Sequence, residues 1–145
     1  MKLHTLVSTL AATLALALPT AAQAGETPSP AGAAVYFIVL EDGSVVESPF
    51  RVRFGLSGMG VAPAGVEKAN TGHHHLLLNT EPPKGEDLEY SIPADENHRH
   101  FGGGQTETMV DLPPGKHTLQ LLLGDQNHIP HNPPMMSPKI SITVK

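Results

Sequence analysis

Short apolar runs alternate with turn-forming residues along most of the chain. In the stretch 50–56 (FRVRFGL), aliphatic and aromatic residues occupy every second position, and arginines lie between them. That period of two is the pattern of a strand buried on one face. Other segments share the composition of strands and are separated by Gly, Pro, Asn or Asp. The strands predicted are 34–40, 50–56, 72–79, 88–92, 106–112, 117–123 and 139–144.

No segment beyond the first 24 residues has the apolar spacing and the capping residues of an amphipathic helix. Short strands joined by turns are typical of all-β domains built from two packed sheets. The sequence therefore predicts an all-β fold, a seven-stranded antiparallel sandwich of immunoglobulin-like type. A small closed barrel is the alternative that the same pattern allows.

The first residues have the pattern of a secretory signal peptide. Lys2 supplies a positive charge, residues 10–18 an apolar core, and residues 22–24 (AQA) a cleavage site between small residues. We expect residues 1–24 to be removed, residues 25–33 to form a flexible linker rich in Pro and Gly, and residues 34–145 to form one β-sandwich domain. The apolar core is shorter than the roughly 20 residues of a membrane span. The expected location is the periplasm or the medium.

Charge and cysteine content narrow the classes of partner. Without the predicted leader and its one lysine, the formal net charge becomes −6, and eight of the nine histidines remain. A negative chain is a poor partner for nucleic acid or anionic lipid, both of which are held by basic patches. The chain contains no cysteine, which excludes disulfides and thiolate metal ligands.

The histidines are concentrated in a few places rather than spread along the chain. They lie at 73–75, at 98 and 100, at 117, and at 128 and 131. If neighbouring strands run up and down, the start of the strand 72–79, the loop 93–104 and the loop 124–134 lie at the same end of the sandwich. We therefore expect three groups of imidazoles to meet there, with His117 at the opposite end.

Imidazole is the commonest protein ligand of Zn, Cu, Ni and Fe. Along a strand, His73 and His75 project from one face about 6.6 Å apart, a spacing from which both can bind one ion. The interpretation is a copper or zinc site, with Met135 and Met136 as thioethers that would favour copper, and Glu107 and Asp125 as outer partners that orient a ligating ring. The candidate metal ligands are His73, His75, His98, His100, His128 and His131.

Each of these residues also has a purely structural interpretation. The histidines of the strand can be hydrogen-bonded in a sheet, His98 and His100 can be solvated on either side of Arg99, and His128 and His131 can pack in a proline-stiffened loop. His74 points away from its two neighbours, into the core or to the surface. His117 is expected to cap the turn at 113–116.

The glycine run 102–104 invites comparison with a phosphate-binding loop. No Gly-Lys-Ser/Thr follows Gln105, and no helix begins there, so a sharp turn or bulge is the better interpretation of Gly102, Gly103 and Gly104. The sequence also lacks the serine-hydrolase elbow and the zincin helix. An enzyme is therefore not predicted, although three histidines around a metal with an open position would permit catalysis.

Four segments together carry a resemblance to a known family. They are SPFRVRFGLSGMGVAPAG (48–65), TGHHHLLLN (71–79), FGGGQTE (101–107) and LPPGKHTLQLLLGDQNHIPH (112–131). The chain resembles a family of small exported bacterial domains of unknown function, and the resemblance implies no activity. A looser similarity connects it to periplasmic copper carriers, which place His and Met on β-sandwiches; this is an analogy of fold.

From the residues we expect a histidine-rich protein that binds copper or zinc and carries or buffers the ion. The metal ion is the expected partner, together with an envelope protein. The first alternative is a module without metal that recognises an envelope protein or a glycan. The second is a metal-dependent enzyme, which would need a pocket with an acid such as Glu107 beside an open coordination position.

Overall fold

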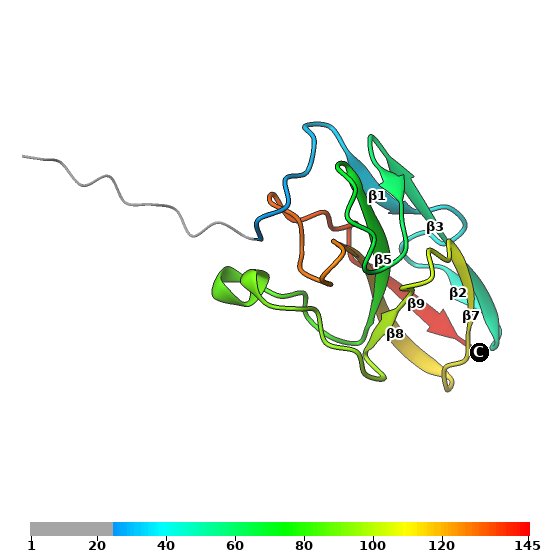
Figure 1. Cartoon of the computed structure of the whole chain (residues 1–145). Coiled ribbons are helices and arrows are strands. Elements are labelled where there is room, and N and C mark those ends of the chain that lie inside the picture. The colour runs from blue at the N-terminus through cyan, green and yellow to red at the C-terminus, as the bar shows by residue number, and fades with distance from the viewer. Residues whose placement is uncertain (1–24) are drawn as a thin grey trace, which may run out of the picture.

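The computed structural model describes residues 25–145 (Figure 1). The predicted signal peptide, residues 1–24, lies outside the described residues. Within the described part there is one 3₁₀ helix, η1 (Gly85–Glu89), and nine strands. The strands are β1 (Ala34–Phe37), β2 (Val45–Val46), β3 (Phe50–Ser57), β4 (Gly60–Val61), β5 (Thr71–Leu78), β6 (His98–His100), β7 (Glu107–Val110), β8 (Gly115–Gly124) and β9 (Ile140–Val144).

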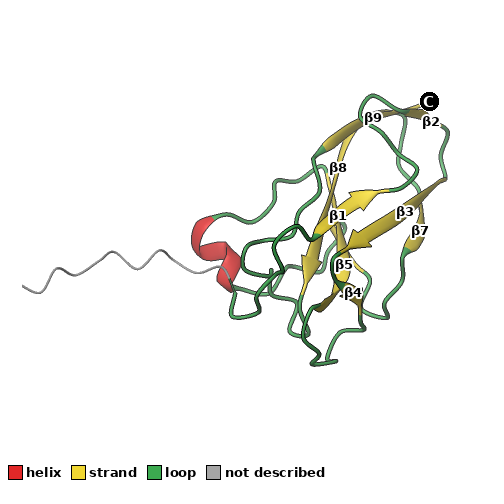
Figure 2. Cartoon of the chain, turned by 90° about the horizontal axis from the view of Figure 1, so that it is seen from above, coloured by secondary structure: helices red, strands yellow, loops and turns green. Residues whose placement is uncertain are grey.

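The strands, drawn in yellow in Figure 2, form two sheets. The smaller sheet has the order β1-β3-β7 and is antiparallel throughout. The larger has the order β2-β9-β8-β5-β4, and β6 pairs with β5 as well. The long antiparallel pairing of β5 with β8 forms the centre of the larger sheet.

Alternation along the strands decides which side chains enter the core. On β3, Val52 and Phe54 are buried while Arg51 and Arg53 are exposed, as the period of two predicts. On β5 every residue is buried, so both faces of this strand are covered. One face of β5 carries Leu76 and Leu78 into the main core, together with Leu119 and Leu121 of β8 and residues of the smaller sheet.

The opposite face of β5 and β8 carries a smaller apolar cluster. Leu77 and Leu122 pack there with Ile92, and Met136 packs against the three of them. The covering segments are the excursion between β5 and β6 and the loop between β8 and β9. This second face also carries His73 and His75.

The prediction of an all-β architecture is confirmed, but the prediction of seven purely antiparallel strands is wrong. β2 pairs with β9 and β4 pairs with β5 in parallel. The predicted strand at 88–92 does not form, because the prolines around it and the acidic turn favour η1 and an irregular segment. A short strand, β6, forms instead within the predicted loop 93–104. No helix in the part that the structure describes has the length and apolarity needed to cross a bilayer.

Residues 25–33, expected to be a flexible linker, lie along the loop between β8 and β9. The backbone N–H of Ser29 donates to the carbonyl of Asn132 at 3.0 Å, and the N–H of Asn132 donates to the carbonyl of Thr27 at 2.9 Å. The hydroxyl of Thr27 donates to the Asp125 carboxylate at 2.7 Å. The segment is therefore attached to the loop that carries His128 and His131.

Replacing a fully buried leucine of the β5–β8 pair should be strongly destabilising. Leu121→Ala leaves a cavity between the two sheets, and we expect a loss of about 2–5 kcal/mol in the free energy of unfolding. Ile38→Ala is the matched control, because Ile38 is 52% exposed and its truncation should cost less than about 0.5 kcal/mol. Urea denaturation measures both, and equal losses in the two variants would contradict the assigned core.

Candidate metal centre

Three histidines open β5, and the strand sends them to two faces. Antiparallel pairing places His73 opposite Gly124 and His75 opposite Leu122, on the face of the smaller apolar cluster. His74 points the other way, into the main core. All three side chains are fully or almost fully buried.

His74 packs in the core against Phe54. The two ring centroids are 5.2 Å apart and the rings are tilted. Neither ring nitrogen of His74 has a hydrogen-bond partner. Burial lowers its pKa to about 4, so the ring is neutral and behaves as a core aromatic. His74 therefore belongs to the packing between the sheets.

The short strand β6 brings the next histidine to the same face. His100 lies opposite His75 in the antiparallel register of β5 and β6, and the ring centroids are 5.1 Å apart. Its Nε2 atom lies 3.1 Å from Nε2 of His73. In contrast to the two histidines of β5, His100 is exposed. The ring therefore covers the centre from the solvent side.

The loop between β8 and β9 supplies a fourth ring. Nδ1 of His128 lies 3.2 Å from Nε2 of His73. The backbone of His128 has a φ of 65°, a left-handed conformation that is uncommon for a residue with a side chain. The Asp125 carboxylate holds this turn by accepting hydrogen bonds from the N–H groups of Asn127 at 2.8 Å and Ile129 at 3.0 Å. Strained backbone kept in place by a buried acid is typical of functional sites.

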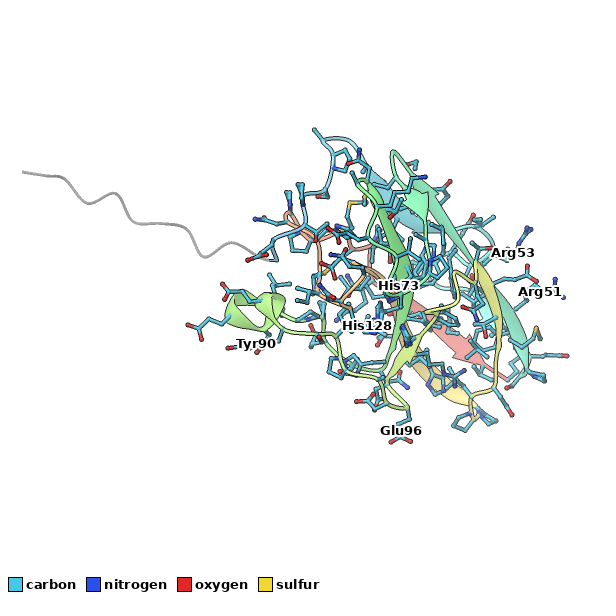
Figure 3. All side chains as sticks on the ribbon, in the orientation of Figure 1. Arg51, Arg53, His73, Tyr90, Glu96 and His128 are labelled. Atoms are coloured by element: carbon cyan, nitrogen blue, oxygen red, sulfur yellow. The ribbon has the colours of Figure 1, made fainter. Side chains whose placement is uncertain are left out.

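Together, His73, His75, His100 and His128 each offer one ring nitrogen, and these four atoms lie within 4.8 Å of one another. Figure 3 shows the labelled His73 and His128 close together beside β5. A ring nitrogen carries one proton or one lone pair, so His73 Nε2 cannot make a full hydrogen bond with both of its neighbours. Zn–N bonds of about 2.0–2.1 Å place the nitrogens of a tetrahedral site about 3.3 Å apart, close to the two observed contacts.

Two glycines provide the space that the rings occupy. A Cβ atom on Gly124 would lie 2.7 Å from Cε1 of His75, and a Cβ atom on Gly102 would lie 2.3 Å from Cε1 of His100. Both separations are far shorter than carbon atoms tolerate. The glycines therefore allow the backbone to approach the two rings.

The electrostatics of the centre favour neutral imidazoles. Burial, with additional repulsion from His128 and His100, lowers the pKa of His73 to about 4. Burial, with repulsion from His73 and His100, lowers the pKa of His75 to about 2. The pKa of His100 is lowered as well, by burial and by His128. Neutral imidazole is the form that binds metal, so these rings need no deprotonation at neutral pH.

The structure places the remaining predicted ligands elsewhere. His98 lies two residues before His100, but its Nδ1 contacts the Asp95 carboxylate at 2.8 Å, outside the group. His131 is fully buried, does not belong to the group, and packs close to Gly72. Of His98 and His100, the group therefore contains His100. Of His128 and His131, it contains His128.

The other residues singled out in the sequence have structural surroundings. Glu107 forms ion pairs with Arg51 and Arg53 on the smaller sheet, so it does not orient a ligating ring. Met136 packs in the apolar cluster, and the carbonyl of Met135 accepts a hydrogen bond from the N–H of Leu123. His117 contacts the Pro113 carbonyl at 2.8 Å, in agreement with the capping role expected for it.

The glycine run forms a sharp turn, as expected. The N–H of Gly104 donates to the carbonyl of Phe101 at 3.0 Å, and Gly104 has a φ of 82°. The side-chain oxygen of Gln105 accepts a hydrogen bond from the N–H of Gly103. Two contributors were not among the predicted residues: Gly124, which makes room for His75, and Thr27, which binds Asp125. The one signal for Gly124 in the sequence is its position between the apolar run 121–123 and Asp125.

Residues 52–145 match the family described as Domain of unknown function (DUF4399). The chain belongs to the DUF4399 family. This confirms the resemblance seen in the sequence. No curated protein and no solved structure matches the chain. The match to the DUF4399 family begins within β3, runs to residue 145 and contains all four converging histidines.

The depressed pKa values make the stability of the metal-free DUF4399 domain depend on pH. Below about pH 6.5 the unfolded chain takes up protons on His73 and His75, whereas the folded chain keeps both rings neutral down to about pH 4 or lower. The free energy of unfolding should therefore be highest above pH 6.5 and fall as pH is lowered towards 4. Urea denaturation at several pH values measures the slope, which His75→Gln should make shallower. Parallel slopes for the two proteins would refute this assignment.

Proposed function

We propose that this protein binds one transition-metal ion, copper or zinc, through His73, His75, His100 and His128, and carries or buffers it. The observation that supports the proposal is the meeting of four ring nitrogens from three separate segments at one place. The arrangement leaves the buried Nδ1 atoms of His73 and His75 without a hydrogen-bond partner, which lowers the stability of the metal-free fold. Binding of a cation at the centre would offset that cost.

The donor set indicates the kind of metal. The set consists of imidazoles, and the chain contains no cysteine. Imidazole without thiolate suits Zn²⁺ and Cu²⁺, whereas thioethers favour Cu⁺. Met136 packs in the apolar cluster of Leu77, Ile92 and Leu122. We therefore favour Zn²⁺ and Cu²⁺ over Cu⁺.

Carriage or buffering is supported by the unequal burial of the four rings. His73 and His75 are buried on the rigid centre of the larger sheet, while His128 is half-buried and His100 is exposed. An ion can therefore enter and leave on the side of His100 and His128 without opening the core. With the predicted signal peptide, the proposed place of action is the periplasm or the medium.

We also propose that the fold is a variant of the immunoglobulin-like sandwich. The support is that two sheets enclose one shared core, with strand β2 added in parallel at an edge. On that scaffold the metal centre would lie on the outer face of one sheet, beneath its long loops.

Titration of tag-free protein with Zn²⁺ and Cu²⁺ tests the metal proposal. We expect one ion per chain, and at a free ion concentration of 100 times Kd the metal should add about 2.7 kcal/mol to the free energy of unfolding. His73→Gln should weaken binding by more than the roughly 10–100-fold that loss of an outer partner costs, because His73 is itself a ligand. His98→Gln is the control, since it removes a nearby histidine that lies outside the group and should bind as the unchanged protein does. Binding no tighter than millimolar, or equal loss in both variants, would refute the proposal.

A pair of glycine variants tests the geometry without removing a ligand. Gly102→Ala introduces a Cβ where the His100 ring lies, so the ring must turn away and the affinity for metal should fall about tenfold or more. Gly103→Ala is the control in the same turn, because the nearest atoms to its Cβ belong to the end of the exposed Gln105 side chain, which can shift into solvent. Calorimetric titration measures both, and unchanged affinity in Gly102→Ala would show that His100 is not a ligand.

A further inference from the structure

A groove lies beside the histidine centre and is built from the excursion between β5 and β6. It has a volume of about 540 Å³, within the range of pockets that hold ligands or several side chains. Most of its lining comes from the segment 81–93, and His98 completes it. In Figure 1 this excursion, with η1 at its tip, projects from the body of the domain on the side away from β2 and β7.

The lining of the groove is largely apolar and contains three prolines. Pro82, Pro83 and Pro93 form part of the walls, and Ile92 connects the groove to the apolar cluster beneath it. Tyr90 also lines the groove and is 67% exposed, and Figure 3 shows it near the tip of the excursion. Exposed tyrosine beside prolines offers a large contact surface that loses little conformational entropy on binding.

The charge of the segment that builds the groove is strongly negative. Residues 81–96 contain six acids and one lysine, which gives −5, the net charge of the entire chain; the remaining positions balance. All six acids are exposed. Among the described residues, Glu81 is the one acid of this segment that pairs with lysines, Lys84 and Lys139, and Asp95 contacts His98. The other four, Glu86, Asp87, Glu89 and Glu96, leave the excursion negative, and Asp87 is the one of them that lines the groove.

The groove is also tied to the loop that carries a metal ligand. The hydroxyl of Ser91 donates to the carbonyl of Asn127 at 3.0 Å, and the N–H of Ile92 donates to the carbonyl of His128 at 2.8 Å. His98, which lines the groove, begins the strand that ends in His100. A molecule seated in the groove therefore lies next to the two rings on the solvent side of the centre.

We propose that this groove docks a basic segment of a partner protein, with an apolar or aromatic side chain inserted between Tyr90 and the prolines and with lysines or arginines facing the acids of the excursion. Charge complementarity selects this partner, because these acids repel nucleic acid and anionic lipid and attract a cationic chain. The proposal goes beyond metal binding and does not require it. It also gives the chain a function as an interaction module.

Peptides of matched shape and opposite charge test the groove. The probes are fluorescein-labelled pentapeptides with a central Phe, Tyr, Leu or Pro, flanked on both sides by two basic residues, two acidic residues or two serines. Fluorescence anisotropy with the metal-free full chain should show binding of basic peptides, weakening as salt rises, and no binding of the acidic set. Chemical-shift changes on the labelled protein should centre on Tyr90, Ile92 and His98.

Two variants and a control locate the binding surface. Tyr90→Ala and Asp87→Lys should each weaken binding of the basic peptides at least fivefold. Glu47→Lys makes the same change of charge at an exposed residue directly after β2, and β2 lies on the side of the domain away from η1 (Figure 1). It should alter the affinity less than twofold. Circular dichroism verifies that each variant is folded.

Several results would overturn the docking proposal. They are the absence of binding tighter than millimolar by any basic peptide, equal binding of acidic and basic peptides, and an equal effect of Asp87→Lys and Glu47→Lys. Binding of arginine methyl ester as tight as that of the peptides would indicate a small cation as the ligand in place of a protein segment. The peptides are tested on metal-free protein, so the two experiments are independent. Absence of peptide binding would not bear on the metal proposal, and absence of metal binding would not bear on the docking proposal.

Discussion

The pairing of β5 with β8 is the constraint on which the rest of the structure depends. Its register places Leu76 opposite Leu121 on one face and His73 opposite Gly124 on the other. The first face supplies the core between the sheets, and the second face supplies both the apolar cluster and the histidine centre. A slip of one residue would exchange the faces and move the histidine pair into the core, so the packing of the leucines fixes the site.

The histidine centre is less favourable for stability than the core that supports it. Buried ring nitrogens without partners, each costing about 1–3 kcal/mol, and a left-handed backbone at His128 all oppose folding of the metal-free chain. Asp125 and Thr27 hold the loop in this conformation through hydrogen bonds to its backbone and to each other. Features that lower stability at one place, supported by a dedicated network, are typical of a binding site.

Much of this arrangement could be predicted from the sequence because it follows from periodicity. The alternation in 50–56 and the long apolar runs identify β3, β5 and β8, and the end of the sheet at which His73 and His75 lie follows from them. The order of the remaining strands could not be predicted in this way. β2 and β4 have two residues each, too few for a period, and the prolines near Ile92 turn a strand-like composition into an irregular excursion.

Which of the loop histidines join the group could not be predicted from the periodicity of the sequence. His100 joins the group because residues 98–100 add to the edge of β5, and His128 joins because Asp125 holds a left-handed turn. His131, three residues later and equally plausible in the sequence, is directed elsewhere by the same turn. The concentration of net charge in residues 81–96 was visible in the sequence, but its relation to a groove required the folded excursion.

X-ray absorption spectroscopy of tag-free protein loaded with one equivalent of Zn²⁺ or Cu²⁺ tests the central claim most directly. Coordination by the four histidines predicts nitrogen scatterers at about 2.0–2.1 Å with the multiple-scattering pattern of four imidazoles, falling to three in His100→Ala. A spectrum dominated by oxygen or sulfur ligands, or one with fewer than three imidazoles in the unchanged protein, would contradict it.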